Sequence, residues 1–149
     1  MDKIQQLREY TRELECHLDN INQADCCQCG VGKAECFLIV EIGRKPGISI
    51  KELAGILKVD KSGVSRSVEE LVKKGFVTRE PSETDRRYVV LKLTESGYVR
   101  FEKIEKDMYI EYKKVFSMIK KSDQDKVLEA LRIYNEACRK AEERANEDD

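Results

Sequence analysis

Apolar residues recur at helical spacing over most of this chain. Near the N-terminus they alternate at spacings of three and four, if Thr11 is counted, which predicts a helix with one narrow apolar face. The members of this stripe are Ile4, Leu7, Leu14, Leu18 and Ile21. Residues 22–32 break the pattern with three cysteines and two glycines and predict a loop. A second helix is expected at about 33–44, closed by Pro46 and Gly47.

The central part of the chain predicts two short helices and a hairpin. Residues 49–52 have the spacing of a capping box, in which the first and last side chains satisfy amides at a helix start. A turn over 59–63 separates this helix from the next one, which ends at Gly75. The period then changes to two in 76–79 and 88–93, on either side of a polar turn. Two short helices followed directly by a hairpin form the winged helix-turn-helix.

Two more helices are expected after the hairpin. Thr94 caps the first of them, whose apolar positions continue to Ile119, and Ser122 begins the second. The apolar positions of the last helix, spaced to face one way, are Val127, Leu131, Tyr134 and Cys138. Together with the N-terminal stripe, these stripes present more apolar surface than a lone winged helix can cover, so the sequence predicts a homodimer.

The expected fold class is mainly α with a small β-hairpin wing, in a single domain over residues 1–149. The winged helix-turn-helix occupies about 31–93 of this domain. Dimerisation helices and the cysteine loop occupy about 1–30 and 94–149.

Composition and charge narrow the class of protein. Charged residues make up 38% and apolar residues 40%, the balance of a helix-rich soluble chain. No apolar run approaches the roughly 20 residues of a membrane span, and the first residues form no signal-peptide core, so we expect a cytoplasmic protein without membrane contact. The net charge of -1 gives no global sign of nucleic-acid binding. Between Lys61 and Lys92, however, basic residues outnumber acidic ones by eight to five.

The candidate DNA-contacting residues lie at two places in this basic segment. The second helix of the pair starts with small hydroxyl side chains and one arginine, which suit base edges and phosphates, and its free amides favour a phosphate. At the hairpin tip, paired arginines suit an adjacent minor groove, with Asp85 close enough to hold one in position. The candidates are Lys61, Ser62, Ser65, Arg66 and Ser67 in the helix, and Asp85, Arg86 and Arg87 in the hairpin. The alternative is a solvated basic face without function.

The order of these residues resembles the MarR family of transcription regulators. The residues that resemble its wing signature are Asp85, Arg86, Arg87, Leu91, Leu93, Thr94 and Gly97. Those that resemble its recognition helix and first wing strand are Ser65, Arg66, Leu71, Gly75, Phe76, Val77 and Arg79. The resemblance covers the whole chain and implies a two-fold dimer on double-stranded DNA, with recognition helices in successive major grooves of a pseudo-palindromic operator. It also implies repression that a ligand relieves.

Four of the six cysteines lie within eleven residues, 26–36, a cluster that ordinary members of that family do not need. In a reducing compartment they suit metal binding, redox sensing or packing rather than a disulfide framework. Cys26 and Cys29 have the spacing that grips one ion or forms a disulfide, and Cys27 adds a third sulfur. Sulfur ligands favour a thiophilic ion such as zinc, copper(I) or arsenite.

Two further cysteines are candidates for the same site. For Cys36, packing and sensing both stay open. Cys16 lies on the order of 10 Å from the end of the first helix at 1.5 Å per residue, so it joins the loop thiols only if the loop folds back or both subunits supply ligands. His17 is the only histidine, which excludes two histidine ligands from one chain. Cys138, on an apolar stripe, is expected to pack.

Three functional hypotheses follow. The leading one is a dimeric repressor whose operator affinity changes when the cysteine loop binds a metal or metalloid or is oxidised. The second is a DNA-binding regulator with a purely structural zinc, or with cysteines that sense nothing. The third is a thiol oxidoreductase on Cys26 and Cys29, which lacks the βαβ setting and the catalytic base of such enzymes.

Overall fold

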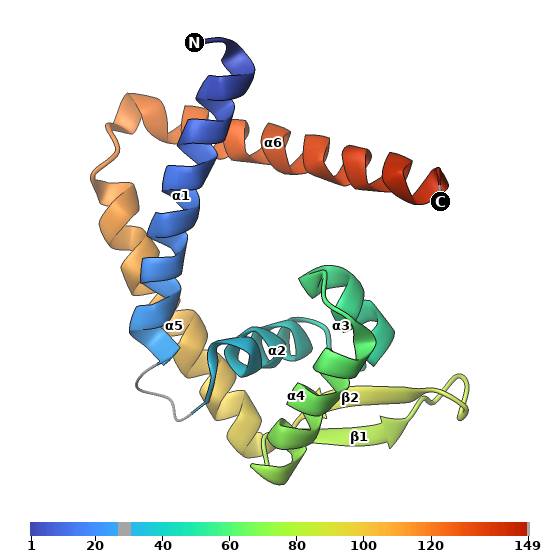
Figure 1. Cartoon of the computed structure of the whole chain (residues 1–149). Helices are drawn as coiled ribbons and strands as arrows, with labels where there is room; N and C mark the ends of the chain where they lie inside the picture. Colours follow the sequence, from blue (N-terminus) through green and yellow to red (C-terminus); the bar gives the residue numbers. More distant parts are fainter. Residues whose placement is uncertain (27–30, 149) are drawn as a thin grey trace. The chain divides into compact units, whose positions relative to one another are not determined.

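The structure is a computed structural model that describes residues 1–26 and 31–148, with the backbone alone for 23–26. Its elements, drawn in Figure 1, are α1 (Lys3–Cys26), α2 (Lys33–Arg44), α3 (Ile50–Leu57), α4 (Lys61–Lys73), β1 (Val77–Pro81), β2 (Val89–Leu93), α5 (Glu95–Ser117) and α6 (Lys121–Glu147). They divide into two compact units, Met1–Tyr109 and Ile110–Asp149, and α5 contributes to both. The fold is the expected one, mainly helical with a two-stranded wing.

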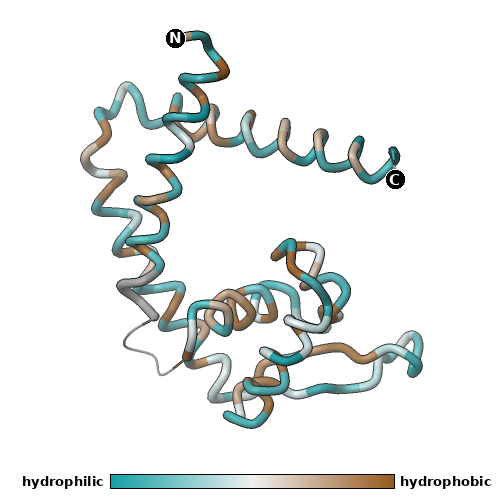
Figure 2. Tube along the Cα trace, in the orientation of Figure 1, coloured by the Kyte–Doolittle hydropathy of each residue, from teal (hydrophilic) through white to brown (hydrophobic). Residues whose placement is uncertain are grey.

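The hydrophobic core of the first unit is built around α2. Leu38, Ile39 and Ile42 of this helix are at most 1% exposed. They pack with buried side chains of α3, α4 and the hairpin, chiefly Leu53, Val68, Leu71, Val77 and Leu91. Each such side chain stabilises the fold by about 1.5–3 kcal/mol when removed from water. Figure 2 shows apolar stretches along α2 and β2, whereas apolar and polar positions alternate along α1 and α6.

The wing is an antiparallel hairpin with a short third partner. β1 pairs with β2 so that Val77 lies opposite Leu93 and Arg79 opposite Leu91. Ile48 forms an isolated bridge to Leu91, in which the Leu91 amide donates to the Ile48 carbonyl at 2.9 Å. The segment before α3, which the sequence predicted only as a helix stop, therefore also extends the sheet and closes the core.

The end of α4 is tied to the start of α5. Gly75 takes the left-handed conformation (φ +81°) that terminates α4, as its position predicted. Thr94 accepts from the Gly97 amide at 3.0 Å, which confirms it as the cap of α5, and donates to the Gly75 carbonyl at 2.6 Å. A side chain at Gly97 would place its Cβ 2.0 Å from the Phe76 carbonyl oxygen, so only glycine permits this close approach.

Several predicted boundaries are corrected by the structure, among them the end of α5, which is Ser117 rather than Ile119. α1 continues to Cys26 rather than stopping before Asn22, because residues 22–26 contain neither glycine nor proline to end the helix. α4 begins at Lys61, with Asp60 as its cap, so the turn before it is shorter than 59–63. α6 begins at Lys121, after Lys120 as N-cap, and not at Ser122.

The second unit consists of the end of α5 and all of α6. The Gln124 side chain fastens the turn between them by donating to the carbonyls of Phe116 and Ile119 at 3.4 and 3.3 Å. No residue that the structure describes in α6 is buried. In the ranges that the structure describes, no helix is long and apolar enough to cross a membrane.

Candidate nucleic-acid interface

The polar face of α4 points to solvent, as a helix that enters a DNA groove requires. Val64, Val68 and Leu71, spaced by four and three, are buried in the core and fix the rotation of the helix. The predicted contact residues lie on the remaining surface: Lys61, Ser62 and Arg66 are exposed, and Ser65 and Ser67 are half-buried. All of them except Lys61 lie one or two positions along the chain from a buried valine, which fixes the direction in which they project.

A carboxylate occupies the beginning of α4. Asp60 Oδ1 accepts from the Gly63 amide at 2.7 Å and so caps the helix. A Cβ at Gly63 would lie 2.8 Å from that oxygen, which makes glycine part of the cap. The expectation that this helix end offers its amides to a phosphate stays a prediction, with one amide already satisfied by Asp60 and a negative charge beside it that opposes an anion.

Asp85 binds Arg87 through a bidentate ion pair, the Asp85–Arg87 fork, at the tip of the wing. Arg87 Nε donates to Asp85 Oδ1 at 3.0 Å, Nη2 donates to Oδ2 at 2.8 Å, and the Arg87 amide donates to Oδ1 at 3.1 Å. These hydrogen bonds hold the pKa of the Asp85 carboxyl below its usual range, so the carboxylate stays charged. The Arg87 side chain is still 84% exposed, which leaves a planar donor group fixed in direction and open to solvent. The expected proximity of Asp85 to a tip arginine is confirmed.

Hydrogen bonds within the tip hold the wing in one conformation. The Ser82 amide donates to the Tyr88 carbonyl at 2.9 Å, and the Tyr88 amide donates to the Asp85 carbonyl at 3.1 Å. The hydroxyls of Ser82 and Thr84 lie 3.0 Å apart. The Asp85–Arg87 pair therefore lies in a turn whose conformation is fixed by hydrogen bonds.

Ion pairs divide the eight basic residues between Lys61 and Lys92 into two groups. The paired ones are Lys73 with Glu70 (3.6 Å), Lys74 with Glu35 (2.8 Å), Lys92 with Glu80 (3.2 Å) and Arg87 with Asp85 (2.8 Å). Lys61, Arg66, Arg79 and Arg86 make no ion pair with any residue that the structure describes. Their charges are therefore the most available to phosphates.

The cysteine candidates are only partly within the structure. Cys27 and Cys29, and the side chain of Cys26, lie outside the described residues. Cys16 is exposed on α1, whereas Cys36 is 8% exposed and belongs to the hydrophobic core. Among the side chains that the structure describes, no group of three or more metal-ligating residues could hold an ion.

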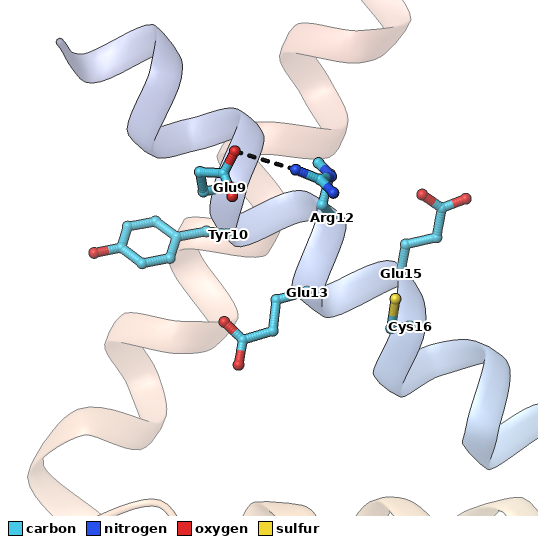
Figure 3. A pocket seen from close by; sticks show the side chains of 6 residues that line it. All are labelled: Glu9, Tyr10, Arg12, Glu13, Glu15 and Cys16. Atoms are coloured by element: carbon cyan, nitrogen blue, oxygen red, sulfur yellow. Dashed lines mark hydrogen bonds and ion pairs between the residues drawn. The ribbon is translucent and has the colours of Figure 1, made fainter. Parts of the chain in front are cut away.

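The surface around Cys16 is formed by α1 itself. Figure 3 shows a shallow pocket there, lined by Glu9, Tyr10, Arg12, Glu13, Glu15 and Cys16. Arg12 Nη1 lies 3.3 Å from Glu9 Oε1, and His17 Nε2 lies 3.6 Å from Glu13 Oε1. All of these residues come from one helix, so the pocket has no opposing wall and does not enclose a ligand.

One candidate for the DNA surface was missed by the sequence reasoning. Arg79 of β1 is exposed, and its Nη2 donates to the Ser65 carbonyl of α4 at 3.4 Å. The signal for it was the period of two in the first strand, which places Arg79 on the same face as the buried Val77.

A helix-turn-helix whose second helix faces solvent, followed by a hairpin with a fixed arginine at its tip, defines the class of winged-helix DNA-binding proteins. The family model described as "MarR family" matches residues 30–87. The transcriptional regulator BilQ of Clostridium symbiosum (strain WAL-14163) is 32% identical over 102 residues, which are 68% of this chain and 71% of BilQ. The chain therefore belongs to the MarR family and is a DNA-binding transcription regulator.

Two further comparisons extend this similarity. The transcriptional repressor MdtR of Bacillus subtilis (strain 168) is 28% identical over 75 residues, covering 50% of this chain and 48% of MdtR. The structure of FabT from Streptococcus pneumoniae in complex with DNA has a TM-score of 0.79 and 20% identity, and the match covers 93% of this chain and 99% of FabT. Because the family consists of transcription regulators, the chain is not an enzyme, and the oxidoreductase hypothesis is excluded.

Proposed function

We propose that this chain is a cytoplasmic, dimeric repressor that binds a pseudo-palindromic operator and loses affinity for it when a thiophilic metal, metalloid or oxidant reacts with the cysteine loop. The observation that carries the DNA-binding part is the Asp85–Arg87 fork on an ordered wing tip, in the same unit as the solvent-facing polar side of α4. MdtR is named a repressor, and FabT was solved with DNA, which supports the same roles here.

In this proposal α4 enters the major groove and Arg87 the neighbouring minor groove. Ser62, Ser65 and Arg66 meet base edges and phosphates, with Lys61 and Ser67 beside them. Arg86 adds a charge at the wing tip that no carboxylate of the described residues neutralises. Residues 31–93 form the DNA-binding part, while 1–30 and 94–149 supply the dimer contacts and the cysteine loop.

Exposed apolar side chains support the dimer. On α1, Ile4 is 75% and Leu7 45% exposed, and on α6, Leu128 is 54% and Leu131 41% exposed. Apolar faces of this kind on several helices of one chain are costly in water and are normally covered by a partner. A second copy of the chain is the occupant, because a two-fold operator needs two recognition helices.

The contacts of α2 support a route from the cysteine loop to the DNA-binding helix. Cys29 precedes the start of α2 by four residues. Glu35, in the first turn of α2, accepts from the Gly32 amide at 3.4 Å and from Lys74 Nζ at 2.8 Å. Lys74 is the C-cap of α4. A ligand that bridges the loop thiols therefore acts on the start of α2, where the Glu35 carboxylate also binds the end of α4. A coupling free energy of about 1–3 kcal/mol between the two sites is enough to release the operator.

The DNA-binding part is tested by Arg66→Ala and Arg87→Ala. Each substitution should weaken operator binding by about 1–3 kcal/mol and leave the thermal midpoint nearly unchanged, because both side chains are exposed. Fluorescence anisotropy with an operator selected in vitro measures the first quantity and differential scanning calorimetry the second. Unchanged affinity in both variants would remove the assignment of α4 and the wing.

The sensing part is tested by replacing Cys26, Cys27 and Cys29 together with Ser. The variant should fold and bind the operator but no longer release it on addition of Zn²⁺, Cu⁺, arsenite or hydrogen peroxide. Release equal to that of the parent chain would contradict the proposal. Chelation of the parent separates a sensory ion from a structural one, because only loss of a structural zinc melts the fold.

A further inference from the structure

Arg79 lies on the face of the hairpin that packs against the helices. Its neighbour at two positions, Val77, is 2% exposed, and its cross-strand partner Leu91 is fully buried. Because side chains alternate along a strand, Thr78 and Glu80 project from the opposite face, where Glu80 pairs with Lys92 at 3.2 Å. Of the basic side chains on the two wing strands, Arg79 is thus the one directed toward α4.

The guanidinium of Arg79, an exposed residue, lies beside the second turn of α4. Its stem follows the row of Val77, and Nη2 donates to the Ser65 carbonyl at 3.4 Å. This bond is longer than an ordinary N–H···O bond, and a guanidinium carries five N–H donors, so most of its donor capacity remains. No carboxylate in the part of the chain that the structure describes pairs with it.

The place of Arg79 between α4 and the wing decides which part of DNA it faces. A major groove and the adjacent minor groove are separated by one sugar-phosphate strand. With α4 in the first groove and Arg87 in the second, a side chain that emerges between them meets the phosphates of that strand.

We propose that Arg79 binds a DNA phosphate on this strand, with the Ser65 carbonyl orienting its guanidinium. The inference rests on the proposed mode of DNA binding. It assigns Arg79 a part in affinity that does not depend on base sequence, because a phosphate contact is the same at every site.

The test is Arg79→Gln, with Arg44→Gln as the matched control. Both changes remove one guanidinium from the first unit, and Arg44, at the end of α2, pairs with Glu105 of α5 at 3.5 Å rather than with a residue of α4 or the wing. Affinity is measured at several salt concentrations for the selected operator and for an unrelated duplex of equal length. Arg79→Gln should lower the slope of log K against log salt by about one per chain, and so by about two per dimer. It should weaken binding by the same factor on both duplexes.

Each outcome bears on one proposal. The parent is expected to lose affinity steeply as salt rises. If it does, and if Arg79→Gln has the same salt slope as Arg44→Gln, the role of Arg79 is overturned and the proposed function stands. Weaker binding on the operator alone, with an unchanged slope, also overturns it, because Arg79 then only positions α4. A parent that binds no duplex, or binds independently of salt, overturns the proposed function itself.

Discussion

Single side chains of the proposed DNA surface are held in position within the free protein. Asp85 fixes the direction of Arg87 through two hydrogen bonds to its guanidinium and one to its amide. A side chain that is already oriented loses less conformational entropy on binding than one that rotates freely in solution. Arg79 has a single and longer contact, 3.4 Å from its Nη2 to the Ser65 carbonyl of α4.

Asp85→Asn should weaken operator binding, and Arg87→Ala should then cost less in the Asp85→Asn background than in the parent. The physical reason is that Arg87 without its carboxylate is no longer held in position, and such coupling is measured by a double-mutant cycle. The lowered pKa of Asp85 means that its contribution is present above the ordinary aspartate range and is lost only as the pH falls through the lowered value. Between about pH 5 and 8 the effect of Asp85→Asn should therefore be constant. Strictly additive costs for the two substitutions would contradict the role of the fork.

Cys16→Ser should leave both ion binding and the response of DNA binding unchanged. Cys16 and Cys26 are ten residues apart on one continuous helix, α1, which separates them by about 15 Å along its axis. Two thiolates on one zinc ion lie within about 5 Å of each other, because each Zn–S bond is about 2.3 Å. Metal stoichiometry by elemental analysis checks this. A loss of bound metal in Cys16→Ser would show that two chains share the site.

At the scale of elements, hydrogen bonds at the junction of α4, the wing and α5 fix the end of α4. The Phe76 amide donates to the Leu71 carbonyl at 3.0 Å, and the Thr94 amide donates to the Phe76 carbonyl at 2.9 Å. Arg100 of α5 lies over the Phe76 ring, with its guanidinium carbon 5.4 Å from the ring centre. The chain leaves α4 and enters α5 through the same few backbone groups, so a change at this junction should affect both helices.

Gly97→Ala should destabilise the fold by at least about 2 kcal/mol, because its Cβ would lie 2.0 Å from a backbone oxygen that cannot move without breaking the junction. Gly55→Ala is the control. Gly55 is exposed inside α3 with open space around it, so alanine there should stabilise by about 0.5–1 kcal/mol. Chemical denaturation at one protein concentration measures both free energies of unfolding. A Gly97→Ala variant as stable as the Gly55→Ala variant would contradict the close approach of Gly97 to the Phe76 carbonyl.

At the scale of the whole molecule, the proposed dimer decides whether the terminal helices are stable. α6 carries one polar side with linked ion pairs, in which Arg132 bonds to Glu129 at 2.6 Å and to Glu136 at 3.0 Å. Such exposed pairs contribute little each. The stability of α6 therefore depends on its apolar side, where no residue is buried within the single chain.

Leu131→Glu should dissociate the dimer and thereby weaken operator binding, because it places a charge on the apolar side of α6. Arg132→Gln, the neighbouring residue on the polar side, changes the net charge by the same amount and should leave the dimer intact. Sedimentation velocity measures the oligomeric state of both.

Removal of the residues before Cys16 should give an unstable or aggregating chain. A monodisperse monomer from that truncation would count against a dimer formed by the terminal helices.

Features that depend on neighbours in the chain could be predicted from the sequence. The spacing of Val64, Val68, Leu71 and Val72 predicts one apolar side of α4; the first three are buried there, whereas Val72 is exposed. Gly75 ends the helix as its position predicted. The closeness of Asp85 to Arg86 and Arg87 on a tight turn was enough to predict that it holds one of the two arginines, and the structure shows that this one is Arg87. These outcomes follow from the backbone period and from local hydrogen bonds, which a short segment determines by itself.

Contacts between distant segments were decided only by the tertiary structure. Arg79 lies 14 positions from Ser65, and Lys74 lies 39 positions from Glu35, so neither contact has a signal in the local pattern. The same holds for the bridge of Ile48 to Leu91. Which side chains of different elements meet depends on how the helices and the hairpin pack around Ile39 and Ile42, and that packing is a property of the whole core rather than of any one segment.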